Sequence, residues 1–159
     1  MSAAAVDVLL LVTLATCTDS GGMNAQSHDV NPRHGWKQRF TPVPPSVHRA
    51  RHAAEAALHG WGVAPGSAQA VLLVLSELAT NAVRHGRVPG RYYEVRIAYD
   101  AEKLVGIEVS DPREGLPRLG DASPDAERGR GLAIVEAFAE AWGVRERIVG
   151  KTVWARVRL

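Results

Sequence analysis

The stretch Ala70–Gly86, AVLLVLSELATNAVRHG, decides the fold of this chain. Its apolar residues recur at the spacing of one helical face, which predicts a helix that buries this face in a core. They are Val71, Leu75, Leu78 and Ala82. Glu77 and Asn81 share a neighbouring flank of the same helix, because residues four apart lie one above the other. By itself the segment is most simply an amphipathic helix with a solvated face.

The polar flank of this helix carries four kinds of functional group, since Arg84 and His85 follow one turn after Asn81. An amide oxygen can ligate a hard cation and a carboxylate such as that of Glu77 can take a proton. A cation at this position can meet phosphate. The flank is therefore a candidate site if other segments of the chain complete it.

Composition indicates one folded domain. The chain has 159 residues, of which 46% are hydrophobic and 23% charged, enough for a core of useful size. The formal net charge of +2 is too balanced to indicate nucleic acid, and we expect no direct contact with it. The single cysteine, Cys17, excludes an internal disulfide and a cysteine-based metal site, and it fits a cytoplasmic location.

Residues 1–35 are expected to be an N-terminal extension and linker, followed by one domain at 36–159. Ala3–Cys17 is nearly all apolar but too short for a membrane span, so we expect no membrane association. A secretory signal needs a positive start, and the first basic residue here is Arg33. A non-native or flexible tail is the preferred interpretation, and export with cleavage near Cys17 is the minority one.

Two helices and a hairpin are expected in the first part of the domain. A short edge strand at 36–41 precedes a helix that Ser46 caps and that reaches about Trp61. Ser67 is expected to cap the central helix. Alternating apolar residues then predict two strands, 93–99 and 105–109.

The C-terminal part is expected to hold a third helix and a second hairpin. The helix begins at Gly129–Leu132 and ends at Gly143, and strands follow at 144–149 and 152–159. Its expected apolar stripe is Ile134, Val135, Phe138, Ala141 and Trp142. Antiparallel hairpins with helices on one face predict an α+β fold, a two-layer α/β sandwich with a mostly antiparallel sheet.

Two further segments can complete the candidate site. Asp111 ends a buried strand, where its carboxylate can accept from an exocyclic amine such as that of adenine. Gly129-Arg130-Gly131 opens a helix, where backbone N–H groups and the helix dipole favour an anion. The aperiodic loop 113–128 between them can close over a ligand. Each signal alone is common, and the order of all three is more specific.

That order resembles the Bergerat-type ATP-binding fold of the GHKL superfamily, over about Trp36 to Leu159. The closest branch is similar to the anti-sigma-factor serine kinases. ELATNAVRHG resembles the N-box of this branch, VSDPREGLP its first glycine box, ERGRGLAIVEAFAEAWG its second, and KTVWARVRL its closing strand. Arg113 is a departure, because the broader superfamily often has glycine two residues after the aspartate.

The resemblance implies roles for the polar flank of the central helix. Glu77 would be the general base that activates the acceptor hydroxyl. Asn81 would ligate Mg²⁺, which bridges the phosphates. Arg84 would contact phosphate and His85 would line the nucleotide pocket.

The resemblance also implies roles in the two glycine boxes. Asp111 would bind the adenine amine, with Thr152 supporting it directly or through water. Gly115 would let the backbone pass close to the base. The residues whose N–H groups would meet the phosphates are Gly129, Arg130, Gly131 and Leu132.

The resemblance thus implies a protein serine/threonine kinase that uses ATP and Mg²⁺ to phosphorylate a STAS-type anti-sigma factor antagonist, regulating transcription by partner switching. A sigma factor is a further candidate partner, and relatives often form homodimers. The first alternative is a nucleotide-tuned binding module that holds a sigma factor or other regulator without kinase activity. A histidine-kinase core and a metal hydrolase rank below both.

Overall fold

The computed structural model describes residues 33–100, 102–113 and 130–159. Gly115, Gly129 and most of the expected N-terminal extension lie outside the described residues. The first strand, β1 (His34–Phe40), begins two residues before the expected start of the domain at residue 36. The edge strand expected at 36–41 is thereby confirmed.

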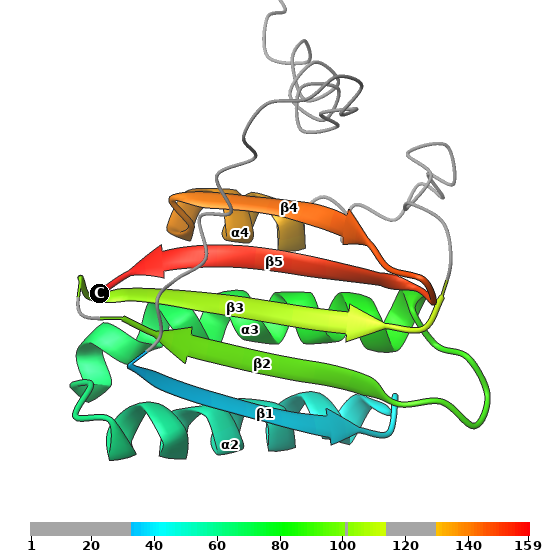
Figure 1. The fold of residues 1–159 in the computed structure, drawn as a ribbon, viewed down its shortest axis with the longest axis horizontal. Helices are drawn as coiled ribbons and strands as arrows, with labels where there is room; N and C mark the ends of the chain where they lie inside the picture. Colours follow the sequence, from blue (N-terminus) through cyan, green and yellow to red (C-terminus); the bar gives the residue numbers. More distant parts are fainter. Residues whose placement is uncertain (1–32, 101, 114–129) are drawn as a thin grey trace, which may run out of the picture.

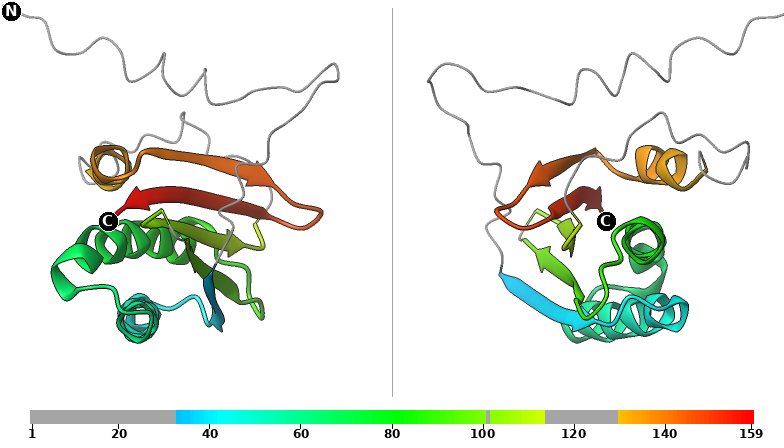
Figure 2. Two further views of the ribbon diagram at one scale, coloured as in Figure 1. Left: turned by 60° about the vertical axis from the view of Figure 1, so that its left-hand side comes forward. Right: turned by 90° about the vertical axis from the view of Figure 1, so that its right-hand side faces the viewer.

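The strands of the described chain form one antiparallel sheet with the order β1-β2-β3-β5-β4. The other four strands are β2 (Tyr93–Tyr99), β3 (Leu104–Asp111), β4 (Ala141–Glu146) and β5 (Lys151–Arg158). The helices α2 (Pro44–Gly60), α3 (Pro65–His85) and α4 (Arg130–Phe138) all cover the same face of the sheet (Figures 1 and 2). The predicted α+β two-layer sandwich is confirmed.

The core lies between the sheet and α3. There the apolar stripe of the helix packs against the apolar side chains that alternate along the strands. The predicted stripe of α3 is buried, with Val71 and Leu75 fully inaccessible and Leu78 only 1% exposed. The strand residues that face it are also buried. They are Val95, Ile97, Val105, Ile107, Val109, Ala155 and Val157. By length and composition α3 could also cross a membrane, but half of it is buried inside the fold, as in a core helix.

The two long helices start at prolines, and the predicted serine caps were wrong. Pro44 and Pro65 lie in the first turns of α2 and α3, where a missing N–H costs no hydrogen bond. Ser46 is instead a fully buried residue inside α2. Its hydroxyl donates to the Val43 carbonyl at 2.7 Å and lies 2.9 Å from the Tyr93 hydroxyl.

The third helix is shorter than predicted. It ends at Phe138, and Ala141, Trp142 and Gly143 belong to β4, not to the helix. Pairing with β5 decides this, and a Cβ atom on Gly143 would lie 3.0 Å from the Trp154 ring, a tight contact that glycine avoids. Phe138, expected in the apolar stripe, is 47% exposed.

The turn of the second hairpin also differs from the prediction. Residues Arg147 to Gly150 form the turn, closed by a hydrogen bond from Arg147 N to Gly150 O of 3.0 Å. Gly150 has φ of +77°, a conformation that favours glycine. Lys151, predicted as a turn residue, is the first residue of β5 and is buried.

Candidate functional site

The candidate site lies where α3 passes between the end of β3 and the start of α4. α3 packs against both of these elements. Its polar flank therefore has Asp111 at the C-terminal end of the helix and the first turn of α4 near the middle.

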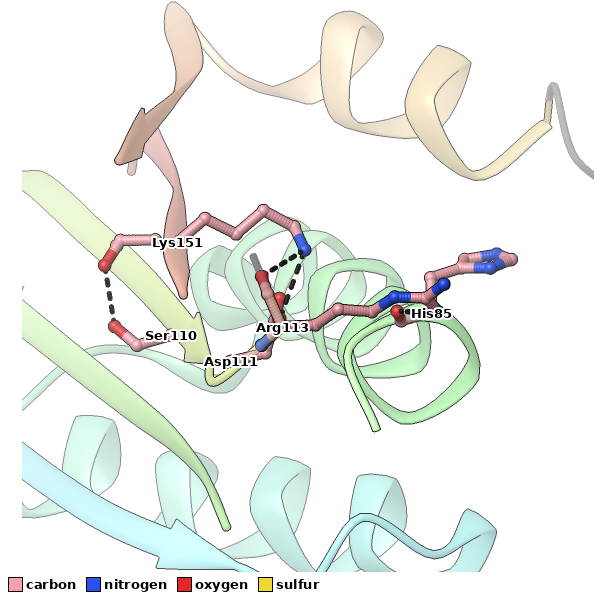
Figure 3. Close-up of polar contacts among 6 residues, drawn as sticks. His85, Ser110, Asp111, Arg113 and Lys151 are labelled. Carbon is pink, nitrogen blue, oxygen red and sulfur yellow. Dashed lines mark hydrogen bonds and ion pairs between the residues drawn. The ribbon is translucent and has the colours of Figure 1, made fainter. Parts of the chain in front are cut away.

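Asp111 is buried at the carboxyl end of β3, with 3% of its surface exposed. It continues the inner face of the strand, because it alternates with Val109 and Ile107. Its Oδ1 atom accepts from Arg113 N at 3.0 Å and from Lys151 Nζ at 3.1 Å (Figure 3). The carboxylate is thus held in one orientation by a tight turn and by a buried ion pair.

The C-terminal end of α3 lies directly against this carboxylate. A Cβ atom built on Gly86 would lie 2.4 Å from Cγ of Asp111, so glycine is required for the approach. Arg113 also reaches α3, where its Nη1 donates to the carbonyl oxygen of His85 at 3.0 Å (Figure 3). A cation suits this position, because the last carbonyl groups of a helix have no partner within it.

Glu77 lies against the first turn of α4. A Cβ atom built on Gly131 would lie 2.7 Å from Oε2 of Glu77, so the predicted base and the predicted phosphate-binding turn are in contact. Asn81 follows one turn later on α3 and is half-buried like Glu77. Arg84 is exposed, as is Leu132 at 37%.

The structure therefore brings the predicted site residues Gly131 and Asp111 to two places along one helix. Glu77 and Gly131 meet at one place, and Gly86 and Asp111 at another, nine positions further along α3. Nine residues of α-helix span about 13 Å. Asn81 lies between the two places. His85 lies at the Asp111 end, where its carbonyl group accepts from Arg113.

Thr152 does not take the predicted place beside Asp111. Its hydroxyl lies 2.8 Å from the Ser110 hydroxyl, and the two residues are register partners on the open face of the sheet. Strand side chains alternate between faces, so Thr152 and Asp111 point to opposite sides. The expected direct support of Asp111 by Thr152 was wrong.

Lys151 is the site residue that the sequence analysis missed. It is the register partner of Asp111 on the inner face, and its side chain is 9% exposed. The signal was present, because counting back by twos from Val157 through Ala155 and Val153 reaches Lys151. Because Lys151 was assigned to the turn, it was not recognised as a buried residue. It is the only buried lysine among the described residues.

The described residues fit a magnesium site only in part. They include no group of three or more His, Cys, Asp and Glu side chains that could hold a metal ion. Mg²⁺ is often held by one or two protein ligands together with substrate phosphates and water. The amide oxygen of Asn81, one turn from Glu77, suits such a site.

Two of the hollows formed by the described residues are large, and neither is lined by Glu77, Asn81 or Asp111. One of about 580 Å³ lies on the open face of the sheet, over residues such as Glu108 and Arg145. The other, of about 370 Å³, lies between the end of α2 and the start of α3. Residues 114–129, which join Asp111 to α4 in the sequence, lie outside the described residues.

The fold and this arrangement of segments define a nucleotide-binding ATPase-type domain. The chain belongs to the histidine kinase-like ATPase domain family, whose model matches residues 40–157. The match includes all of the described site residues, and membership implies an ATP site. No curated protein matches the sequence.

Solved structures support the same fold. The chain is similar to the structure of the RsbU and RsbW domains of Rv1364c from Mycobacterium tuberculosis, with a TM-score of 0.62 and 19% identity. That match covers 80% of this chain and 33% of the other, so the chain spans a third of that structure's length. The SiaB–SiaC complex from Pseudomonas aeruginosa gives a TM-score of 0.53 at 17% identity, covering 78% of this chain and 88% of that one.

Proposed function

We propose that this protein is an anti-sigma-factor-like serine/threonine kinase that binds Mg-ATP and transfers the γ-phosphate to an anti-sigma factor antagonist. The observation that supports it best is the pair of contacts along α3, with Glu77 against Gly131 and Gly86 against Asp111. One helix thereby lines both the base end and the phosphate end of a single nucleotide site. The family membership supports the ATP site itself.

The base end of the site depends on Asp111. A buried carboxylate fixed by two donors through Oδ1 keeps its second oxygen aimed in one direction. We assign that second oxygen, Oδ2, to the exocyclic amine of adenine, since an ionised carboxylate only accepts hydrogen bonds. His85 lies at this end of α3, and Gly115 is proposed to let the backbone pass close to the base.

The phosphate end depends on the start of α4. The first backbone N–H groups of a helix have no partner within it and attract anions. We assign those of Arg130, Gly131 and Leu132 to the phosphates, with Gly129 before them and exposed Arg84 as an added cation. Asn81 would hold Mg²⁺, which when bound neutralises the charge on the phosphates.

Glu77 is proposed to act as the general base. It would accept the proton of the acceptor hydroxyl while that oxygen bonds to the γ-phosphorus and the bond to the β-phosphate oxygen breaks, releasing ADP. The contact of Glu77 with Gly131, at the start of α4, supports this role. Most of the acceleration would come from positioning and charge neutralisation.

The proposed acceptor is a serine or threonine of a STAS-type antagonist domain, and a sigma factor is the second proposed partner. One similar structure is a complex of two proteins, SiaB and SiaC, which supports a protein partner for this fold. The proposed setting is cytoplasmic, with a homodimer as the proposed assembly and no direct nucleic-acid contact. The residues before β1 are proposed to lie outside the catalytic domain.

The test is phosphoryl transfer from radiolabelled Mg-ATP to antagonist domains encoded in the same genome. Wild type is expected to label one of them, and Glu77→Gln to bind ATP normally while transfer falls at least about a hundredfold, as for loss of a general base. Glu55→Gln, which neutralises an exposed glutamate of α2, is the matched control and should transfer like wild type. ATP binding without transfer to any antagonist would contradict the kinase and leave the binding module.

The binding module is favoured by one observation. Arg113 fills the place of a common glycine and ties the start of the loop to α3 through the His85 carbonyl. If nucleotide only tunes a surface, Glu77→Gln should hold a sigma factor or other regulator with the affinity of wild type. Measuring that affinity with and without ATP separates the two functions.

A further inference from the structure

We propose that Lys151 reads the purine base together with Asp111, by donating a hydrogen bond to the ring nitrogen N1 of adenine. This inference rests on the proposed ATP site. It assigns to Lys151 the second half of base recognition, and the direct support of Asp111 that was expected from Thr152. Thr152 lies on the other face of the sheet, bonded to Ser110.

The position of Lys151 supports this role. Its ammonium group is 3.1 Å from Oδ1 of Asp111 and 3.5 Å from the carbonyl oxygen of Arg113. Its side chain runs over the end of β3 toward both acceptors (Figure 3). An ammonium group has three N–H donors, and these two acceptors account for two of them. Neither of these two contacts uses the third donor, which we assign to the base beside the carboxylate that receives the amine.

The pattern of donors and acceptors matches adenine. The Watson–Crick edge of adenine presents one donor, the 6-amino group, next to one acceptor, N1. The site presents Oδ2 of Asp111 next to the ammonium of Lys151. Guanine also presents an acceptor, O6, next to a donor, N1–H, but its 2-amino group adds a second donor. Oδ1 already accepts from Lys151 and Arg113, so this pair offers the second donor no free acceptor, and the site favours adenine over guanine.

Stability alone does not require this ion pair. The two side chains are 9% and 4% exposed, so both charges are largely desolvated. Replacing a buried ion pair by apolar side chains of similar volume is often neutral or stabilising. A ligand that binds both the Asp111 carboxylate and the Lys151 ammonium would explain why a lysine is buried on the inner face of the sheet.

The test compares ATP with 1-deaza-ATP, in which N1 is replaced by C–H and the 6-amino group is kept. Isothermal titration of the full chain with both Mg-nucleotides gives the ratio of their dissociation constants. For wild type we expect 1-deaza-ATP to bind about tenfold more weakly or worse, because a charge-assisted hydrogen bond is lost. GTP should bind more weakly than ATP by a similar factor or more.

The variant Lys151→Met removes the donor and keeps the length of the side chain. It should bind ATP more weakly and distinguish ATP from 1-deaza-ATP less than about twofold, since the group that reads N1 is gone. The matched control is Lys37→Met, which removes the same charge from an exposed position on β1 and should keep the wild-type ratio. If Lys151→Met does not fold, Asp111→Asn and Asp111→Asn/Lys151→Met give the same comparison without an unpaired buried carboxylate.

The outcomes separate this inference from the proposed function. If wild type binds no ATP, the nucleotide site itself is wrong. If wild type binds ATP and 1-deaza-ATP equally, or if a folded variant without Lys151 keeps the wild-type ratio, the lysine is only a partner of Asp111. A folded Lys151→Met that binds neither nucleotide also contradicts the proposal, which gives Lys151 one contact among several. Preference for GTP would reverse the base assignment.

Discussion

Two adjacent residue pairs at the ends of β3 and β5 show how one step along a strand separates two environments. Ser110 and Thr152 are a neutral hydroxyl pair on the open face of the sheet, 2.8 Å apart. Asp111 and Lys151 are a charged pair on the helix-covered face, 3.1 Å apart. Both pairs are in register, yet only the inner one touches Gly86 at the end of α3. The face of the sheet decides which pair can belong to the site.

Breaking the inner pair should have the largest effect on stability. Lys151→Met leaves the Asp111 carboxylate buried without its cation, and losing one partner of a buried pair costs about 3–5 kcal/mol. Denaturant unfolding of wild type and variant measures this loss. Asp111→Leu/Lys151→Met should recover most of it, because no buried charge is left. A loss below about 1 kcal/mol in Lys151→Met would show that the pair is open to water in solution.

The next effect should come from filling the space beside Asp111. Gly86→Ala puts a methyl group 2.4 Å from Cγ of Asp111, a carboxylate held by two hydrogen bonds, and we expect a loss of about 1–3 kcal/mol from overpacking. Gly131→Ala is the matched control. Among the described residues its methyl group meets only the end of the Glu77 side chain, which can move aside. We expect that control to lose about 0.5 kcal/mol or less while phosphoryl transfer falls, and equal losses would contradict the difference.

The buried hydroxyl pair Ser46 and Tyr93 can be compared with the buried ion pair of Asp111 and Lys151. Burial raises the pKa of Tyr93, and the hydrogen bond with Ser46 opposes this only in part. Because the unfolded chain then loses the Tyr93 proton first, stability is retained below about pH 10 and falls as the pH rises above it. Tyr93→Phe should cost about 1 kcal/mol at pH 7 and show a smaller fall above pH 10. Parallel pH curves for the two proteins would contradict the shift.

The smallest effect is expected for the outer pair. Thr152→Val removes a hydroxyl bond that is only partly buried, so we expect a loss of about 0.5 kcal/mol and unchanged affinity for Mg-ATP. Ser110→Ala, which removes the other hydroxyl, should give the same result. A fall of tenfold or more in ATP affinity for Thr152→Val would show that Thr152 does contribute to nucleotide binding.

Strong periodicity made most of this fold predictable. The stripe of α3 and the alternation of β2, β3 and β5 were correct because the buried positions repeat at regular intervals. The boundary between α4 and β4 was not predictable this way. Ala141 and Trp142 also fit a helical spacing, and only their pairing with Arg156 and Ala155 makes them a strand.

The candidate site was partly predictable for a related reason. Motif order indicated that the segments around Glu77, Asp111 and Gly131 belong to one site, and in the structure Glu77 lies against Gly131 and the end of α3 lies against Asp111. The side of the sheet on which a strand residue lies depends on where the turn ends. An error of one residue in the turn exchanged Lys151 for Thr152, since neighbouring strand residues face opposite ways.

The most direct test of the account is a crystal structure of the full chain with Mg²⁺ and a non-hydrolysable ATP analogue. We expect the adenine amine within hydrogen-bond distance of Asp111 and N1 within hydrogen-bond distance of Lys151. We also expect the triphosphate at the start of α4, with the metal ion on Asn81 and Glu77 facing the γ-phosphate. A nucleotide bound instead in the hollow on the open face of the sheet, over Glu108 and Arg145, would contradict it.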